Sequence, residues 1–384
     1  MYLFLITFLI LYGGIHLYAF LKLRDAFRLR PHQIWLLILW MFFMTIIPLL
    51  VRGAEQFGME KAALFFAWPG YLWMGFVFIF TSALLFTDAV TLFYRLVLRQ
   101  LSSRLPDYIY SRNVCRITLL LAVVASGYAY IEAGQIRSEH VVIVSSKLPS
   151  SISRIRIVQI SDVHIGLLLQ KSRQMRILEK ITEAKPDILV STGDLVDGKL
   201  NRDYAISEHD PLAALLAAIP APSGKYAVIG NHEVYAALPQ AVAFSRAAGF
   251  TMLRNQSVQL TNGITISGVD DRAANHKSLA DPGIETALLN SVSKYSFHLL
   301  LKHRPEILPE SDGHFDLQLS GHVHGGQIFP FNFLVRLRHP IPCGTTRTPA
   351  GSSIHVSRGT GTWGPPMRLL APPEVTIIDI ISRP

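Results

Sequence analysis

The sequence predicts a chain of two parts: an all-α membrane-spanning bundle in residues 1–134 and an α/β globular domain in residues 135–384. Half of the residues are hydrophobic and only 16% are charged, which is more apolar than an ordinary soluble domain. The long apolar runs all lie in the first part. In the second part, short apolar runs alternate with amphipathic segments and polar turns, which is typical of α/β folds.

Four apolar stretches in the first part are long enough to cross a bilayer, which takes about 20 residues. They cover approximately residues 3–21, 34–51, 64–93 and 117–131. Aromatic residues near the ends of these stretches are typical of the membrane interface: Trp35, Trp40, Trp68, Tyr71 and Trp73. We therefore predict a multi-pass protein of the cell membrane with about four transmembrane helices.

Basic residues are unevenly distributed among the loops between these stretches. They are concentrated in the first and third loops, at Lys22, Arg24, Arg28, Arg30, Arg95, Arg99, Arg104, Arg112 and Arg116. The second loop has only Arg52 and Lys61, which Glu55 and Glu60 offset. Because cytoplasmic loops carry the excess of Lys and Arg, this pattern places the globular domain outside the cytoplasm.

Three further features limit the function. The net charge is +9, but no dense basic block is present, so we do not expect nucleic-acid binding. The two cysteines, Cys115 and Cys343, lie far apart and indicate neither a disulfide framework nor a cysteine zinc site. Asp88 is the one acid well inside a predicted span, and we expect it to reach the membrane interface; a place in a polar pathway is the alternative.

The second part alternates predicted strands and helices. Apolar residues on one helical face predict a helix over 171–184, which Lys185 and Pro186 end, and Gly249 is a suitable C-cap for another helix. Asn262-Gly263 is typical of a β-hairpin turn. The predicted helices cover 171–184, 211–219 and 238–249; the predicted strands cover 140–145, 155–160, 188–192, 226–229, 258–260, 264–269, 297–301, 315–319, 353–356 and 375–380.

Five of these strands each run into a cluster that contains Asp, Asn or His. The polar residues are Asp162, His164, Asp194, Asn231, His303, His322 and His324. Functional groups of α/β sheets gather at the carboxyl ends of the strands, so we expect these side chains to meet. Carboxylate oxygen and neutral imidazole nitrogen suit divalent Mn, Fe, Zn or Ni. Seven ligands are too many for one ion and suit two, each with a position left for water and substrate.

In chain order these motifs resemble the calcineurin-like metallophosphoesterases, and in particular a bacterial branch that is often tethered to the membrane. The matching residues are Asp162-Val163-His164, Gly193-Asp194, Gly230-Asn231-His232-Glu233, His303 and Gly321-His322-Val323-His324. The resemblance covers approximately residues 150–384. It implies a four-layer sandwich in which two mixed sheets lie between helices.

The resemblance also implies roles for the motif residues. One metal ion is expected on Asp162, His164, Asp194 and His324, and the other on Asp194, Asn231, His303 and His322. Asp194 bridges the two ions. His232 is a catalytic residue on the leaving-group side and not a ligand, and we expect Glu233 or Asp162 to hold its ring. Glu233 stands where many members of the family have Asp.

The implied reaction is hydrolysis of a phosphomonoester, a phosphodiester or a pyrophosphate. The predicted spans favour membrane lipid as a partner and a lipid-linked or envelope substrate, such as the nucleotide-linked glycolipid pyrophosphate known within this family. One alternative is a metal-binding membrane sensor or scaffold without catalysis, although the complete ligand set favours an enzyme. A transporter or channel is a third hypothesis, but the spans lack paired charges and broken helices.

Several residues near the motifs have two interpretations. Arg358 is either a residue that binds substrate phosphate or one that fixes its own loop. The segment 329–338 mixes aromatic residues with Arg336 and Arg338. It is either a lip that rests on the bilayer or a strand pair that covers the sandwich. The remaining histidines of the domain that match no motif are expected to be structural or on the surface: His276, His298, His314 and His355.

The predicted orientation is tested with reporter fusions. Alkaline phosphatase, which folds only outside the cytoplasm, should be active when fused to the C-terminus and inactive when fused after Arg28 in the first loop. GFP at the C-terminus that fluoresces brightly, with an inactive alkaline phosphatase at the same position, would contradict the orientation.

Overall fold

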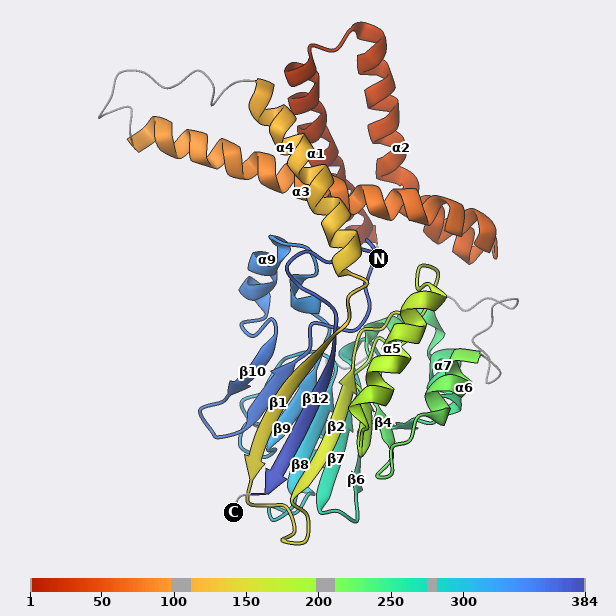
Figure 1. The fold of residues 1–384 in the computed structure, drawn as a ribbon, viewed down its shortest axis with the longest axis vertical. Helices are drawn as coiled ribbons and strands as arrows, with labels where there is room; N and C mark the ends of the chain where they lie inside the picture. Colours follow the sequence, from red (N-terminus) through yellow and green to blue (C-terminus); the bar gives the residue numbers. More distant parts are fainter. Residues whose placement is uncertain (1, 98–111, 198–210, 275–281, 383–384) are drawn as a thin grey trace. The chain divides into compact units, whose positions relative to one another are not determined.

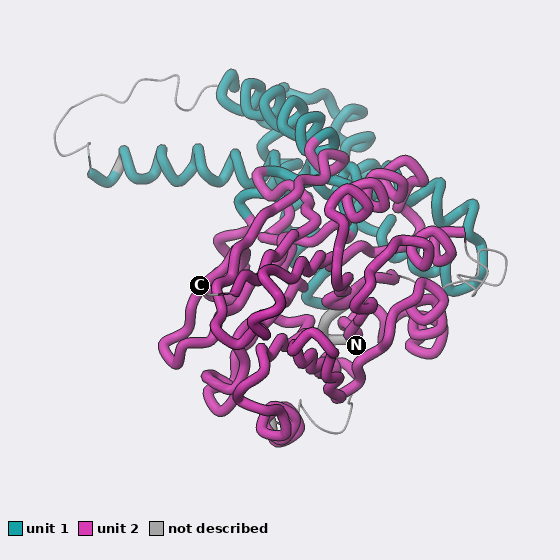
Figure 2. Tube along the Cα trace, turned by 60° about the horizontal axis from the view of Figure 1, so that its bottom comes forward, with its two compact units in different colours: residues 1–131, 328–330, 364–369 teal, residues 132–327, 331–363, 370–384 magenta. Residues whose placement is uncertain are grey.

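The computed structural model describes residues 2–97, 112–197, 211–274 and 282–382 and is drawn in Figure 1. The chain forms two compact units, which Figure 2 distinguishes by colour. The first comprises residues 1–131 with two short later segments, 328–330 and 364–369. The second comprises residues 132–327, 331–363 and 370–384.

In its described residues, the first unit contains four helices that are long and apolar enough to cross a membrane. They are α1 (Tyr2–Phe27), α2 (Pro31–Gln56), α3 (Glu60–Val97) and α4 (Arg112–Glu132). The predicted all-α region of about four helices is therefore confirmed. Small residues on α4, Ala122 and Ala129, lie buried in the core of this unit, because small side chains let helices approach closely. Ile328 and Met367 of the two later segments are buried in the same core.

Asp88 of α3 is paired within this unit. Its carboxylate accepts hydrogen bonds from Lys22 Nζ at 2.6 Å and from the Tyr18 hydroxyl at 2.8 Å. An acid in an apolar helix is costly without such partners. The pair joins α1 to α3, and both interpretations of Asp88 remain predictions.

The second unit contains two six-stranded mixed sheets. The first has the order β1-β12-β2-β3-β4-β5 and the second the order β10-β11-β9-β8-β7-β6. The strands of the first sheet are β1 (Arg137–Ser145), β12 (Glu374–Ser382), β2 (Arg154–Ile160), β3 (Ile188–Ser191), β4 (Lys225–Ala227) and β5 (Thr251–Met252). Those of the second are β10 (Gly344–Arg347), β11 (Ser353–Val356), β9 (Leu317–Ser320), β8 (Phe297–Lys302), β7 (Ile264–Val269) and β6 (Gln256–Gln259).

The two sheets pack face to face, and helices cover their outer faces. Alternation along β2 shows the layering. Ile157 points into the core between the sheets, whereas Val158 points into the outer core, which lies between the first sheet and the helices that cover it. The outer core of the first sheet is shared with α5 (Lys171–Ala184), α6 (Pro211–Ala218) and α7 (Asn231–Ala247), as Figure 1 shows. Side chains of α8 (Pro282–Asn290) and α9 (Phe331–Arg338) pack on the second sheet. The predicted four-layer sandwich is confirmed.

Several elements differ from the prediction. Helix α8 and strands β5 and β10 were not predicted. Residues 331–338 form the helix α9 and not a strand pair, so that alternative was wrong. Val335 packs on the second sheet, whereas the other apolar side chains of α9 are exposed: Phe331, Phe333, Leu334 and Leu337. Helix α7 begins at Asn231 instead of residue 238, because Glu233 bonds back to the Gly230 N–H at 2.8 Å and starts the helix earlier. It is interrupted at Ala237, two residues before Pro239.

His298 of β8 makes the stability of the second unit depend on pH. Its Nδ1–H donates to the His314 carbonyl at 3.1 Å, and its Nε2 accepts from the Ser267 hydroxyl at 2.6 Å. Burial lowers the pKa of His298 to about 4. The folded state favours the neutral ring over the charged one. The contribution of His298 to the free energy of unfolding is therefore complete above the unfolded pKa of about 6.5, and it is lost as pH falls from there towards 4.

As pH falls from 6.5 towards 4, we expect protonation of His298 to lower the free energy of unfolding by an amount on the order of 3 kcal/mol. His298→Gln should therefore lower the thermal unfolding midpoint at pH 7.5 but reduce its further drop between pH 6.5 and 4.5. The exposed His140 provides the control: His140→Gln should keep the wild-type pH profile. An unchanged profile in His298→Gln would contradict this role.

Candidate metal centre

The predicted ligands come from loops at the carboxyl ends of strands in both sheets. β2, β3 and β4 run parallel in the first sheet and lead to Asp162 and His164, Asp194, and Asn231. β8 and β9 run parallel in the second and lead to His303, His322 and His324. Parallel strands place their carboxyl ends at one edge, so the packed sheets bring the five loops together.

Five of the ligand residues adopt a left-handed backbone conformation. Among the described residues that are not glycine, eleven have a positive φ angle, and these five are Asp162, His164, Asp194, His322 and His324 with φ between 51° and 74°. This conformation costs about 1–2 kcal/mol per residue. Such strain persists only where surrounding structure enforces it, and it is concentrated at functional sites.

The glycines of two motifs are required by close packing. A Cβ atom on Gly230 would overlap the Asp194 carboxylate, and one on Gly321 would overlap Ser161 and the Asp162 carboxylate. Absence of a side chain therefore lets the loops after β4 and β9 pass directly beside the acids. This explains why glycine precedes Asn231 and His322.

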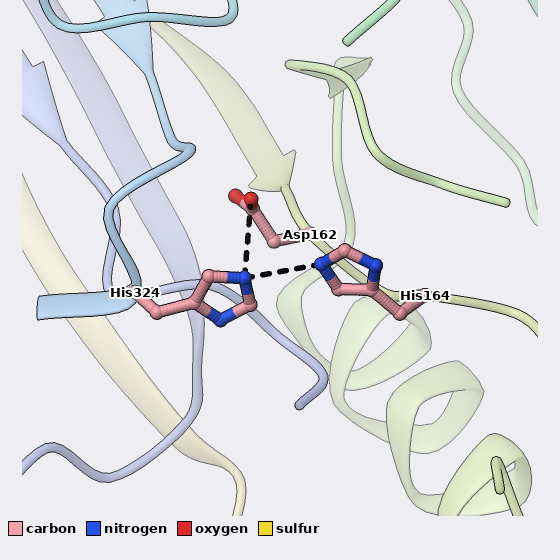
Figure 3. Close-up of side chains that lie close together, drawn as sticks. All are labelled: Asp162, His164 and His324. Carbon is pink, nitrogen blue, oxygen red and sulfur yellow. Dashed lines mark hydrogen bonds and ion pairs between the residues drawn. The ribbon is translucent and has the colours of Figure 1, made fainter. Parts of the chain in front are cut away.

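The first ligand group consists of Asp162, His164 and His324, drawn in Figure 3. The Nε2 atoms of the two histidines lie 3.0 Å apart, and His324 Nε2 lies 3.5 Å from Asp162 Oδ1. The loops after β2 and β9 are also tied together, because both Asp162 oxygens accept from the His322 backbone N–H at 3.0 Å. Three ligand atoms therefore point to one place.

The second group consists of Asp194, His303 and His322. His303 Nδ1–H donates to the Thr192 carbonyl at 2.8 Å, which leaves the Nε2 lone pair directed at Asp194 Oδ2, 3.1 Å away. His322 Nδ1 lies 3.2 Å from the same Nε2. Acceptor atoms this close require a shared cation, either a proton or a metal ion, and the carbonyl bond that fixes the His303 tautomer is typical of metal ligands.

The electrostatics of this group agree with a cation site. Burial opposes charge on His303, but the Asp194 carboxylate outweighs it and raises the pKa of His303 to about 10. Burial also opposes ionisation of Asp194, but His303 holds the pKa of Asp194 well below its usual range. Burial, followed by the charges of His303 and Arg304, lowers the pKa of His322 to about 2, which favours the neutral ring that a metal ligand requires.

His232 is held by Asp197, a residue that sequence reasoning missed. His232 Nδ1–H donates to Asp197 Oδ1 at 2.7 Å, and the other Asp197 oxygen lies 3.6 Å from His164 Nδ1. The expectation that Glu233 or Asp162 holds this ring was wrong, because both acids are engaged by backbone N–H groups. Burial opposes charge on His232, but the bond to Asp197 raises the pKa of His232 to about 9.

His164, Asp197 and His232 also lie close enough to form a third potential metal-binding group. It shares His164 with the first group, so the two groups would compete for that ligand. The short bond between His232 and Asp197 instead fits a ring that keeps its proton. The sequence signal for Asp197 was its place three residues after Asp194.

Glu233 organises the backbone of the site. Its two carboxylate oxygens accept from the N–H groups of Gly230 at 2.8 Å, Asp194 at 2.9 Å and Val196 at 3.1 Å. It therefore connects the loop after β3 to the start of α7. The Asp194 carboxylate in turn accepts from the His232 N–H at 2.8 Å.

Arg358 lies at ion pairs rather than at the ligands. Its guanidinium contacts Glu139, Glu374 and the Pro372 carbonyl, which favours the interpretation that it fixes its loop. His298 and His355 are buried in strands and His314 is exposed, whereas His276 lies outside the described residues. A different arginine, Arg304, contacts the predicted ligands Asn231 and His322.

The comparisons with known proteins identify the family. The sequence profile of the calcineurin-like phosphoesterase family matches residues 155–326. An uncharacterised metallophosphoesterase of Aquifex aeolicus is 39% identical over 267 residues, which are 69% of this chain and 99% of that protein. The chain belongs to the calcineurin-like phosphoesterase family. The resemblance found in the motifs is thereby confirmed.

Bacterial and eukaryotic proteins are both among the relatives of this family member. An uncharacterised metallophosphoesterase of Bacillus subtilis is 36% identical, over 67% of this chain and 90% of that protein. A protein of Danio rerio described as a transmembrane protein with a metallophosphoesterase domain is 31% identical, over 68% of this chain and 61% of that protein. Among solved structures, a 5'-nucleotidase precursor from Thermus thermophilus has a TM-score of 0.37 at 16% identity, over 59% of this chain and 54% of that one.

Family membership and structure agree on a coarse description of the site. Members of the family are metal-dependent phosphoesterases that typically hold two divalent ions. This chain has groups of Asp and His side chains that fit such ions. Together with four apolar helices and a relative described as a transmembrane protein, this indicates a membrane protein with a metallophosphoesterase domain.

The role of Glu233 predicts a loss of stability in Glu233→Gln. The amide nitrogen of Gln would face a backbone N–H, so one buried donor would lose its acceptor at a cost of about 1–3 kcal/mol. We expect a lower thermal unfolding midpoint and a lower metal content. The exposed Glu179 on α5 provides the control, and Glu179→Gln should be neutral. A wild-type midpoint in Glu233→Gln would exclude this role.

Proposed function

We propose that this chain is a membrane-anchored phosphoesterase that hydrolyses a phosphomonoester, phosphodiester or pyrophosphate with two divalent ions of Mn, Fe, Zn or Ni. The observation that carries the proposal is the arrangement of two adjacent groups of Asp and His side chains beside His232, whose ring is held by Asp197. Asp194 Oδ2 faces His303 Nε2 at 3.1 Å, while its other oxygen binds the His232 N–H. Asp194 thus contacts both the proposed ligand His303 and the proposed catalytic residue His232.

The resemblance to the family implies the ligand sets, and the two groups Asp162, His164, His324 and Asp194, His303, His322 support them. Asp162, His164, Asp194 and His324 would hold one ion, and Asp194, Asn231, His303 and His322 the other. When bound, such ions activate water and offset charge on phosphoryl oxygens. The chain contributes rigidity, because left-handed loops, close glycines and Glu233 hold the ligand atoms before substrate arrives.

His232 would stabilise or protonate the leaving oxygen. Its Nδ1–H bond to Asp197 leaves Nε2–H as the donor, and a pKa of about 9 keeps the ring protonated at neutral pH. The exposed rings of Trp363 and Tyr235 flank it, with centroids 5.6 Å and 5.7 Å away. These rings would exclude bulk water from the leaving group.

We further propose that the domain works outside the cytoplasm on a lipid-linked or envelope substrate, with membrane lipid as a partner. The four apolar helices and the distribution of basic loop residues support this. So does α9, in which Leu334 is 57% and Leu337 83% exposed beside the basic Arg336. An exposed apolar face next to basic residues is typical of helices at a lipid surface.

The enzyme proposal predicts that Asp194→Asn abolishes turnover. A neutral amide offers one weak ligand where a carboxylate offers two, so metal and rate should both fall. We expect at least a 1,000-fold slower hydrolysis of an aryl phosphate with Mn²⁺, on the scale of lost electrostatic stabilisation at an active site. Circular dichroism should show that the protein remains folded. Unchanged turnover would reject this assignment.

His232→Ala is the companion variant that separates catalysis from metal binding. It should slow the reaction by roughly 100-fold or more while both ions stay bound. Loss of both metals in His232→Ala would place His232 among the ligands instead. Metal-loaded protein without hydrolysis of any phosphate ester would favour the non-catalytic sensor or scaffold.

A further inference from the structure

Arg304 is a partly buried arginine that the proposed catalytic machinery does not use. It directly follows His303, and its side chain is 15% exposed. Asp271, whose side chain is 1% exposed, accepts from Arg304 Nε at 2.7 Å and from Nη2 at 3.4 Å. This paired contact holds one edge of the guanidinium in a defined orientation.

The other edge of the guanidinium faces the second ligand group. Nη1 lies 2.7 Å from His322 Nε2, and Nη2 lies 3.5 Å from Asn231 Oδ1. A fixed positive charge next to residues that would hold a divalent cation opposes metal binding. Asp271 offsets the charge of Arg304 at one edge, and an anion that lies between the guanidinium and the metal ion would offset it at the other.

Metal binding and the Arg304–His322 contact exclude each other. His322 Nδ1 lies 3.2 Å from His303 Nε2, so Nδ1 is the atom that faces the second group. A neutral imidazole that gives its Nδ1 lone pair to an ion carries its proton on Nε2. Guanidinium nitrogens only donate, so this Nε2–H cannot accept from Arg304. Arg304 Nη1 then lacks an acceptor while Asp271 still holds the side chain.

We propose that Arg304 binds an anionic phosphoryl oxygen of the substrate, and that loading of His322 frees it to do so. Asp271 is the positioning residue that holds the Arg304 guanidinium in place. The inference rests on the proposed phosphoesterase function and adds a substrate-binding residue. A phosphoryl group with two free oxygens matches the two guanidinium nitrogens, Nη1 and Nη2, at the edge that faces the second ligand group.

The test is calorimetric titration of inorganic phosphate into full-length, Mn²⁺-loaded protein in detergent. We expect Arg304→Met to bind phosphate about 10- to 100-fold more weakly, the range for a lost hydrogen bond to a charged group. Arg304→Lys should lose about 3- to 10-fold, because a point charge replaces the fork. The control is Arg272→Met. Arg272 and Arg304 line one cavity of about 60 Å³, but Arg272 pairs with Glu306. The phosphate affinity of Arg272→Met should be unchanged.

Metal affinity is the second measurement. Arg304→Met should bind the metal ions at least as tightly as wild type, because a competing cation is removed. A purely structural arginine would instead show weaker metal binding together with unchanged phosphate affinity per loaded site, and that result would overturn the proposal. If Arg304→Met does not fold, Arg304→Lys decides: wild-type phosphate affinity there would also overturn it.

Failure of the underlying function has a different signature. If metal-loaded wild-type protein binds no phosphate and hydrolyses no phosphate ester, the proposed function and the role of Arg304 are both rejected. If wild type binds and hydrolyses while Arg304→Met binds phosphate equally well, only the role of Arg304 is rejected.

Discussion

His303 Nε2 and Asp194 Oδ2 lie 3.1 Å apart in a buried site, and the rest of the centre is arranged around this contact. Two acceptors in a region of low dielectric repel each other unless a cation lies between them. The Thr192 carbonyl prevents His303 from turning its other nitrogen to the carboxylate. A positive charge between these two atoms therefore stabilises the site. A proton provides part of this stabilisation, and a divalent ion would provide more.

Holding these atoms together requires a rigid scaffold. Five left-handed ligand residues each cost about 1–2 kcal/mol, so the strands that carry them must be anchored elsewhere. The core between the sheets supplies this anchoring, with Ile157, Leu299 and Leu319 completely buried. Glu233 adds three backbone bonds that connect neighbouring loops. The loops that carry the predicted ligands are thus strained and are held in place by hydrogen bonds.

The chain connects this centre to the apolar helices through short segments. Ile328 follows the ligand His324 by four residues and is buried among residues of the helical unit. Met367 follows Trp363, which contacts His232, by the same interval and is buried in the same core. Residues 328–330 and 364–369 therefore belong to the first unit, although the chain on either side of them belongs to the second.

The amino-acid sequence by itself determined the parts that depend on local pattern. Apolar runs of sufficient length predicted the four helices, and alternating short runs predicted most strands. Ligand residue types recur at strand ends, and the order of the motifs identified the family. These signals are local because hydrophobic length, periodicity and strand-end chemistry are properties of neighbouring residues.

The tertiary structure decided which side chains act on one another across the sheets. Asp197 rather than Glu233 or Asp162 holds His232, and Arg304 rather than Arg358 reaches the ligands. Residues 331–338 became a helix although their aromatic content left a strand pair open. These outcomes depend on contacts between segments far apart in the chain, and spacing along the sequence does not encode which of several nearby charges lies within 3 Å of a given ring.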